Sequence, residues 1–118
     1  MHELAIADAV VRIACAHAGE RRVTKVELKV GRLKQVVPDS LEFAFGLVTE
    51  GTVLEGAELE IEDVPARVRC RDCGAEGEVD GFPFGCSSCG SSLVDVVAGE
   101  ELQVESLELE DNSVVVRR

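Results

Sequence analysis

Two short stretches of this sequence, Cys70–Gly74 and Cys86–Gly90, read CRDCG and CSSCG. Each is a Cys-x-x-Cys turn followed by glycine, and 12 residues separate the two cysteine pairs. Such a turn places two sulfurs on one side of a tight loop, so two facing turns form the closed tetrahedron of a structural zinc site. The glycine after each pair suits a positive φ, which glycine adopts without steric cost. We therefore expect one structural Zn(II), bound by Cys70, Cys73, Cys86 and Cys89.

Three other uses of these cysteines have to be weighed. A redox dithiol and a pair of disulfides are both disfavoured, because two separate pairs at ribbon spacing are typical of a metal site. The chain has five cysteines, an odd number, which again favours metal over disulfides in a reducing compartment. The spacing also permits a rubredoxin-like iron site, which the few aromatic residues near the thiols do not favour.

The composition limits the class of protein. The 118 residues suit one domain, and 46% of them are hydrophobic, enough for a core. The net charge is −11 and aromatic residues make up 3%, which disfavours nucleic-acid binding through phosphates or stacked bases. The sequence has neither a signal-peptide pattern nor an apolar run of about 18 residues. We therefore expect a cytoplasmic protein that binds neither membrane nor nucleic acid.

Outside the cysteine segment, the hydrophobic pattern alternates between helices and strands. Residues 3–18 form an amphipathic pattern with Leu4, Ala7, Val11, Ala14 and Ala18 on one stripe. Pro38 opens a second helix, whose Phe43 and Leu47 lie on a second apolar face that either the protein itself or a partner would cover. Residues 23–30, 57–63 and 100–109 alternate as strands, with a change of phase near Leu107.

This order predicts an α+β fold: a small sheet with two packed helices and an inserted four-cysteine zinc ribbon. The expected domains are residues 1–65 with 99–110 as the α/β domain and 66–98 as the ribbon. The ribbon has few large apolar residues, so the metal should supply much of its stability. Residues 111–118 read as a tail, although 114–116 would suit a short edge strand.

The chain begins Met1-His2-Glu3, directly before the first helix. An α-amine and an imidazole both lose a proton to a metal near neutral pH. The Met1 amine, the His2 ring and backbone nitrogens would give the square-planar nitrogen set that Ni(II) or Cu(II) prefers. The first N–H groups of a helix have no intrahelical acceptor, so a metal there breaks no helix bond. Glu3 would partly offset the positive end of the helix dipole.

With these features together, the chain resembles the HypA/HybF family of hydrogenase nickel-incorporation proteins. The resemblance covers residues 1 to about 109. It is carried by the Met1–Leu4 start, Val37–Phe45 (VPDSLEFAF), Gly51-Thr52, Glu55–Leu59, Val64-Pro65, the two cysteine pairs and Gly99–Leu102. Many members have proline after the third cysteine, where this chain has Ser87; that affects the stiffness of the turn and leaves the ligand set unchanged. The segment beyond Glu110 lies outside the resemblance.

The resemblance implies a nickel metallochaperone, a binding and transfer protein rather than an enzyme. Met1, His2 and Glu3 would carry Ni(II) as transferred cargo, while the four cysteines hold Zn(II). The implied partners are the hydrogenase-maturation GTPase and the [NiFe]-hydrogenase large subunit, with urease maturation served by some relatives. The expected assembly is a monomer or a weak homodimer. The alternative is a zinc-ribbon module that binds nucleic acid or protein.

Overall fold

The computed structural model describes residues 2–118, which form an α+β fold as predicted. Its elements are α1 (Glu3–Ala18), β1 (Val23–Gly31), η1 (Arg32–Lys34, a 3₁₀ helix), α2 (Pro38–Val48), β2 (Glu58–Val64), β3 (Arg67–Cys70), β4 (Glu76–Glu78), β5 (Val94–Ala98), β6 (Leu102–Leu109) and β7 (Ser113–Val115). Residue contacts divide the chain into two compact units. The sheet unit comprises residues 2–29, 36–62 and 103–118, and the ribbon unit comprises 30–35 and 63–102.

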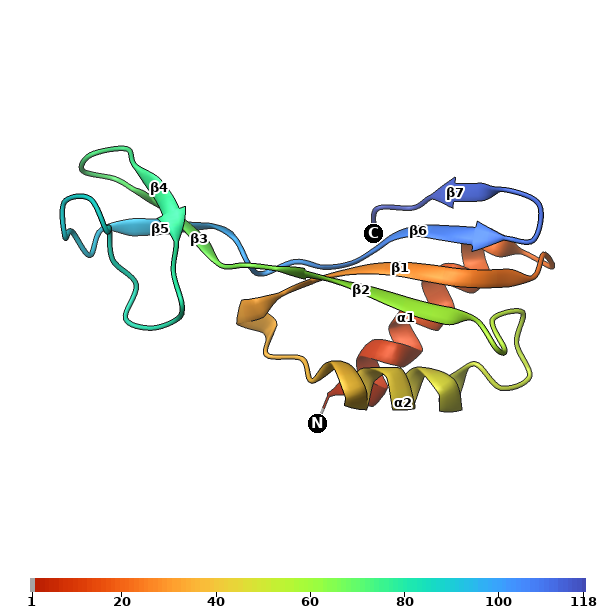
Figure 1. Ribbon diagram of the computed structural model, residues 1–118. Helices are drawn as coiled ribbons and strands as arrows, with labels where there is room; N and C mark the ends of the chain where they lie inside the picture. The colour runs from red at the N-terminus through yellow and green to blue at the C-terminus, as the bar shows by residue number, and fades with distance from the viewer. Residues whose placement is uncertain (1) are drawn as a thin grey trace. The chain divides into compact units, whose positions relative to one another are not determined.

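The sheet unit is built on a four-stranded sheet with strand order β2-β1-β6-β7. Helices α1 and α2 pack against each other and cover one face of this sheet (Figure 1). The order confirms that residues 100–109 pair in the same sheet as 23–30 and 57–63. The apolar faces of helices and strands meet in one core, whose largest fully buried side chains are Val23, Val26, Leu28, Leu41, Leu54, Val104 and Leu107.

Helix α1 has the predicted bounds, but its first turn differs from the prediction. Leu4, placed on the apolar stripe by periodicity, is 55% exposed, whereas Glu3 is only 5% exposed. The Glu3 carboxylate accepts a hydrogen bond from the Val37 N–H at 3.2 Å, which gives this acidic side chain a partner inside the sheet unit. The other four residues of the predicted stripe, Ala7, Val11, Ala14 and Ala18, are buried, so the difference is confined to the first turn, where Glu3 is buried in place of Leu4.

The second apolar face of α2 is open. Leu41, Ala44 and Phe45 are buried against the sheet unit, as the spacing predicts. Phe43 and Leu47, in contrast, are 71% and 51% exposed. No described part of the sheet unit buries this second face.

Residues 111–118 pair with β6 along the edge of the sheet, the edge-strand arrangement that the sequence suggested for 114–116. Ser106 lies opposite Val115, and the Val104 and Arg118 backbones exchange two hydrogen bonds of 2.7 and 2.9 Å. Between these pairs, the Val116 and Arg117 N–H groups both donate to the Glu105 carbonyl, and Arg117 has φ 54°. Two residues facing one is the pattern of a β-bulge.

The ribbon unit contains a three-stranded antiparallel sheet with strand order β4-β3-β5. Arg69 lies opposite both Glu76 and Asp95, so one face of this sheet is charged. Val68 and Cys70 occupy the alternate positions of β3, on the opposite face of the sheet, and both are buried. The ribbon unit therefore has a thin apolar layer, and its largest buried aliphatic side chains are valines.

Candidate metal centre

Two turns of the same geometry carry the four cysteine sulfurs. In each, the N–H of the residue after the second cysteine donates to the carbonyl of the first: Gly74 to Cys70 at 3.0 Å and Gly90 to Cys86 at 2.9 Å. Both glycines have a positive φ, 78° and 79°, as predicted from their position after each pair. The equal geometry explains why the sequence repeats Cys-x-x-Cys-Gly.

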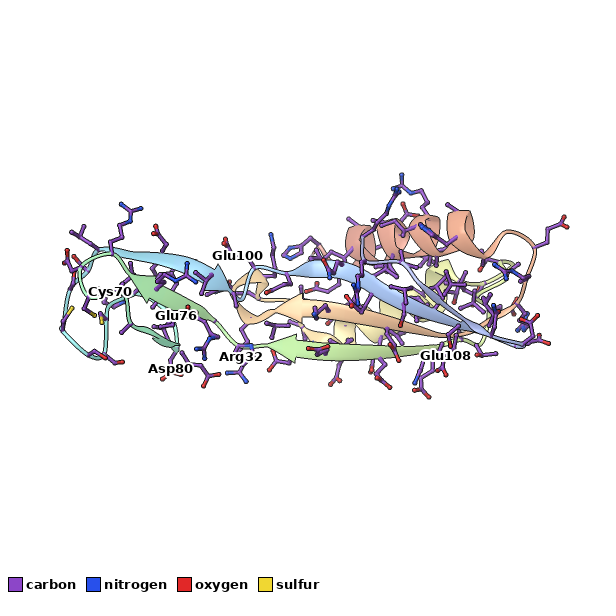
Figure 2. All side chains as sticks on the ribbon, turned by 90° about the horizontal axis from the view of Figure 1, so that it is seen from above. Arg32, Cys70, Glu76, Asp80, Glu100 and Glu108 are labelled. Atoms are coloured by element: carbon purple, nitrogen blue, oxygen red, sulfur yellow. The ribbon has the colours of Figure 1, made fainter. Side chains whose placement is uncertain are left out.

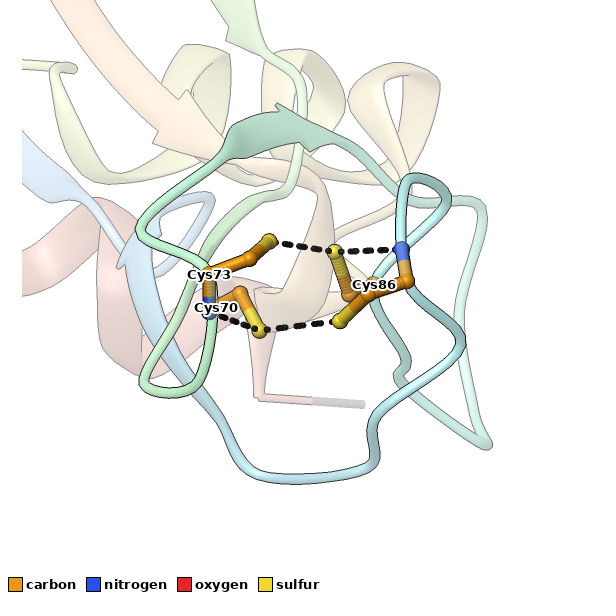
Figure 3. A group of neighbouring side chains, drawn as sticks. Cys70, Cys73 and Cys86 are labelled. Atoms are coloured by element: carbon orange, nitrogen blue, oxygen red, sulfur yellow. Dashed lines mark hydrogen bonds between the residues drawn. The ribbon is translucent and has the colours of Figure 1, made fainter.

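The two turns bring the four sulfur atoms together (Figure 3). All four lie within 4.8 Å of one another, with Cys70 and Cys89 at 3.6 Å and Cys73 and Cys86 at 3.5 Å. A tetrahedron with Zn–S bonds of about 2.3 Å has sulfur–sulfur edges of roughly 3.8 Å. The sulfur cage therefore has the size and donor type of a tetrahedral thiolate metal site.

In each turn, a backbone N–H group donates a hydrogen bond to one cysteine sulfur and lowers the pKa of that thiol. The Cys89 N–H donates to the Cys86 sulfur at 3.4 Å and lowers the pKa of that thiol to about 6. The Cys73 N–H likewise donates to Cys70 and lowers its pKa. The Ser91 N–H favours the Cys89 thiolate, but the neighbouring Cys70, Cys73 and Cys86 sulfurs and burial together outweigh it, and the pKa of Cys89 is raised to about 12. One thiol in each turn is thus more easily ionised than a free cysteine, while Cys89 needs a cation to lose its proton at neutral pH.

Charged side chains brace the turns from outside. Arg71, next to the first ligand, pairs with Asp95 of β5 at 2.6 Å. Asp72 accepts a hydrogen bond from Ser91, whose hydroxyl oxygen in turn accepts the Leu93 N–H at 3.0 Å. These contacts tie the first turn to the segment after the second. They were not predicted from the sequence, because the pairs lie 19 to 24 positions apart.

The predicted nickel ligands lie at the start of α1. His2 is the N-cap residue and is exposed, and its carbonyl accepts the first described helix bond, from the Ile6 N–H at 3.0 Å. Glu3 is buried with its carboxylate against the Val37 N–H. Met1 lies outside the described residues. The structure thus shows a residue that sequence reasoning missed, Val37, which connects Glu3 to the start of α2.

Helix α1 carries one further histidine and the fifth cysteine, His17 and Cys15. The His17 Nδ1 lies 2.9 Å from the Ile13 carbonyl in the last turn of α1, and the residue is half-buried. Cys15 is half-buried and forms no disulfide. Over residues 2–118, the four ribbon cysteines are the only group of three or more clustered His, Cys, Asp or Glu side chains. In the same residues, no helix is long and apolar enough to cross a membrane.

The sequence of this chain is similar to those of known nickel-incorporation proteins. A family model described as hydrogenase/urease nickel incorporation, metallochaperone, hypA matches residues 1–109. The hydrogenase maturation factor HypA of Geotalea uraniireducens is 50% identical over 110 residues, covering 93% of this chain and 100% of that protein. The factor of the same name from Nostoc punctiforme is 44% identical over 111 residues, covering 94% and 97%.

Solved structures share the fold. The solution structure of the Ni metallochaperone HypA from Helicobacter pylori has a TM-score of 0.65 at 23% identity, covering 92% of this chain and 97% of that one. The family match over nearly the whole chain and the relatives at 44–50% identity point the same way. This chain therefore belongs to the HypA family of hydrogenase/urease nickel-incorporation metallochaperones.

Proposed function

We propose that this chain holds Zn(II) in its four-cysteine cage and carries Ni(II) at its N-terminus for delivery to [NiFe]-hydrogenase. The observation that carries the proposal is the pairing of a closed sulfur cage, suited to a permanent ion, with an exposed histidine at a helix start, suited to a transferred one. In this proposal the protein acts by binding and transfer rather than by catalysis, in the cytoplasm.

The zinc assignment is supported by the donor set. Four thiolates at tetrahedral spacing suit zinc or iron and exclude metals that prefer oxygen ligands. Because one thiol of each turn has a lowered pKa, zinc binding at neutral pH should release fewer than four protons. Elemental analysis of the purified protein should give one zinc per chain, and an iron–thiolate colour would contradict the assignment.

The nickel assignment is supported by the start of α1. The proposed ligands are the Met1 amine, the His2 imidazole and nearby backbone nitrogens, with Glu3 in a supporting role. The exposed His2 ring is open to an incoming acceptor, whereas the contact between Glu3 and Val37 anchors the chain directly after it. Because Glu3 is held by Val37 while the adjacent His2 ring is exposed, the site would be ordered without enclosing the ion.

A calorimetric Ni(II) titration tests this site. His2→Ala, or one extra residue before Met1, should abolish or strongly weaken binding because each removes a nitrogen donor or displaces it. His17→Ala is the matched control and should bind nickel as the native protein does. If the extended form keeps its nickel affinity, or if cysteine variants lose nickel while His2→Ala retains it, the proposed site is wrong.

The proposed partners are the hydrogenase-maturation GTPase and the [NiFe]-hydrogenase large subunit, with urease maturation as a second route; the chain itself would be a monomer or a weak homodimer. Transfer of ⁶³Ni from this protein to the purified large-subunit precursor, with and without the GTPase, tests this directly. A zinc-ribbon nucleic-acid module would instead form a salt-sensitive complex with DNA or RNA, which the net charge of −11 disfavours.

A further inference from the structure

The ribbon unit contains a cavity of about 390 Å³ that is separate from the sulfur cage. This volume lies in the range of roughly 300–1,000 Å³ that is usual for binding pockets. None of its lining residues is a cysteine, so the metal site does not account for it. The lining comes from η1, the segment around residues 79–84 and the neighbouring strands: Arg32, Leu33, Gln35, Ala66, Val79, Asp80, Gly81, Phe82, Phe84, Val96 and Glu100.

Apolar side chains form much of the cavity wall. The rings of Phe82 and Phe84 stack with their centroids 4.2 Å apart and an interplanar angle of 26°. Phe82 is 85% exposed, although the whole chain has only four phenylalanines and neither tryptophan nor tyrosine. Exposing a large aromatic side chain beside a cavity is characteristic of a surface that receives an apolar group.

The rim of the cavity is acidic. Asp80 and Glu100, two of the lining residues labelled in Figure 2, are exposed and form no ion pair with any residue of the described chain. Arg32, the third lining residue labelled in Figure 2, donates to Asp63 at 2.9 Å, and its pKa is raised chiefly by Asp63 and more weakly by the charge of Asp80. An apolar wall with two exposed carboxylates at its edge, neither in a close ion pair, complements a group that is apolar at its centre and cationic at its flanks.

We propose that this cavity binds a short basic-hydrophobic peptide segment of a partner protein. A leucine or phenylalanine side chain of the segment would fill the cavity, while flanking lysine or arginine residues would face Asp80 and Glu100. An arginine could also lie over the exposed ring of Phe82. The acidic rim disfavours nucleic acid and anionic lipid surfaces, which the same carboxylates would repel. This site goes beyond nickel binding, since it uses no residue of the proposed nickel site.

The test is a titration of ¹⁵N-labelled, zinc-containing protein with the acetylated and amidated peptide Lys-Arg-Leu-Phe-Arg-Lys, followed by NMR. We expect saturable shifts confined to the cavity lining, chiefly residues 79–84, 96 and 100. The same peptide with both apolar residues changed to alanine, or with all four basic residues changed to glutamate, should not saturate. Absence of binding at about 1 mM peptide, saturable shifts elsewhere, or equal binding of the control peptides would each overturn the proposal.

Two variants separate the apolar and the charged contributions. Phe82→Ala removes an exposed ring and should weaken peptide binding at least about fivefold. The double variant Asp80→Lys/Glu100→Lys should weaken it at least about tenfold at low salt. Glu58→Lys/Glu62→Lys makes the same change in net charge on exposed positions of β2 and should cost about twofold or less. If that control weakens binding as much as the rim variant, the attraction is general and the site is refuted.

Zinc content and spectral dispersion show whether each variant is folded. The Ni(II) titration of both cavity variants should match the native protein, so failure of the peptide site and failure of the nickel site are distinguishable. Unchanged peptide affinity in folded Phe82→Ala and in the folded rim variant would overturn the inference.

Discussion

The sheet unit and the ribbon unit are stabilised in different ways. All seven of the largest fully buried side chains belong to the sheet unit, whereas the ribbon unit buries small residues and two of its cysteines. Burial of a leucine or valine side chain contributes about 1.5–3 kcal/mol, so the sheet unit has its own source of stability. The ribbon unit has little apolar area and four thiols within 4.8 Å, so we expect its stability to depend on a metal. The comparison predicts that each unit can be damaged without the other.

Loss of the metal should have the largest effect. Cys86→Ser removes one ligand and should unfold residues 66–98, since structural zinc contributes about 10–16 kcal/mol in small zinc domains. Hydrogen exchange should become fast in that segment while α1 stays protected. Cys15→Ser is the matched control and should leave zinc content and both units intact. Loss of protection in α1 as well would show that the two units are one cooperative structure.

The converse change lies in the core of the sheet unit. Leu107→Ala should cost about 2–5 kcal/mol, because Leu107 is fully buried and its removal leaves a cavity. The helical circular dichroism signal should melt at lower temperature while the zinc content stays the same. Val115→Ala, in β7 of the same unit and 66% exposed, is the control and should cost much less. Release of zinc by Leu107→Ala would contradict the separation.

A third change tests packing inside the ribbon unit. A Cβ at Gly31 would lie 2.1 Å from the carbonyl carbon and oxygen of Gly99, so the backbone has to move. Gly31→Ala should therefore cost about 1–3 kcal/mol. In the exposed part of α2, Gly46→Ala meets nothing within 4 Å and should stabilise by up to about 1 kcal/mol. Equal stability of the two variants, measured by urea unfolding, would show that the close contact is not maintained in solution.

The smallest effect is expected on the open face of α2. Phe43→Ser should change the unfolding free energy by less than about 0.5 kcal/mol, because the side chain is 71% exposed. Phe45→Ala on the buried face should cost about 3–5 kcal/mol. A cost above about 1 kcal/mol for Phe43→Ser, growing with protein concentration, would instead show that a second copy covers this face.

Most of the fold could be predicted from local pattern. The bounds of α1, the start of α2 at Pro38 and the sheet of three alternating segments all follow from periodicity and capping. Leu4 was not placed correctly: Glu3 is buried in its stead, with its carboxylate accepting the Val37 N–H from 34 positions away. Hydrophobic periodicity carries no information about such a pair.

The candidate site likewise has features that local sequence predicts and features that depend on contacts between distant segments. The four cysteines were predicted from spacing because the chemistry of a metal ligand depends on residue type and turn geometry, both of which are local. The brace between Arg71 and Asp95 and the cavity beside Phe82 depend on segments that meet only in the folded ribbon unit. The nickel ligands remain a prediction from sequence, since Met1 lies outside the described residues.

The close contact of Ala66 and Gly99 has a consequence for the chain path. A Cβ on Gly99 would lie 2.6 Å from the Ala66 Cα, so the chain departs into the three-stranded sheet and returns from it at nearly the same point. If residues 67–98 were removed, a turn of about two residues would join Ala66 to Gly99, and closing so short a loop would cost little conformational entropy. Residues 67–98 therefore leave the chain path and rejoin it at adjacent positions, so an insertion of different length with equally close ends would not stretch the backbone on either side.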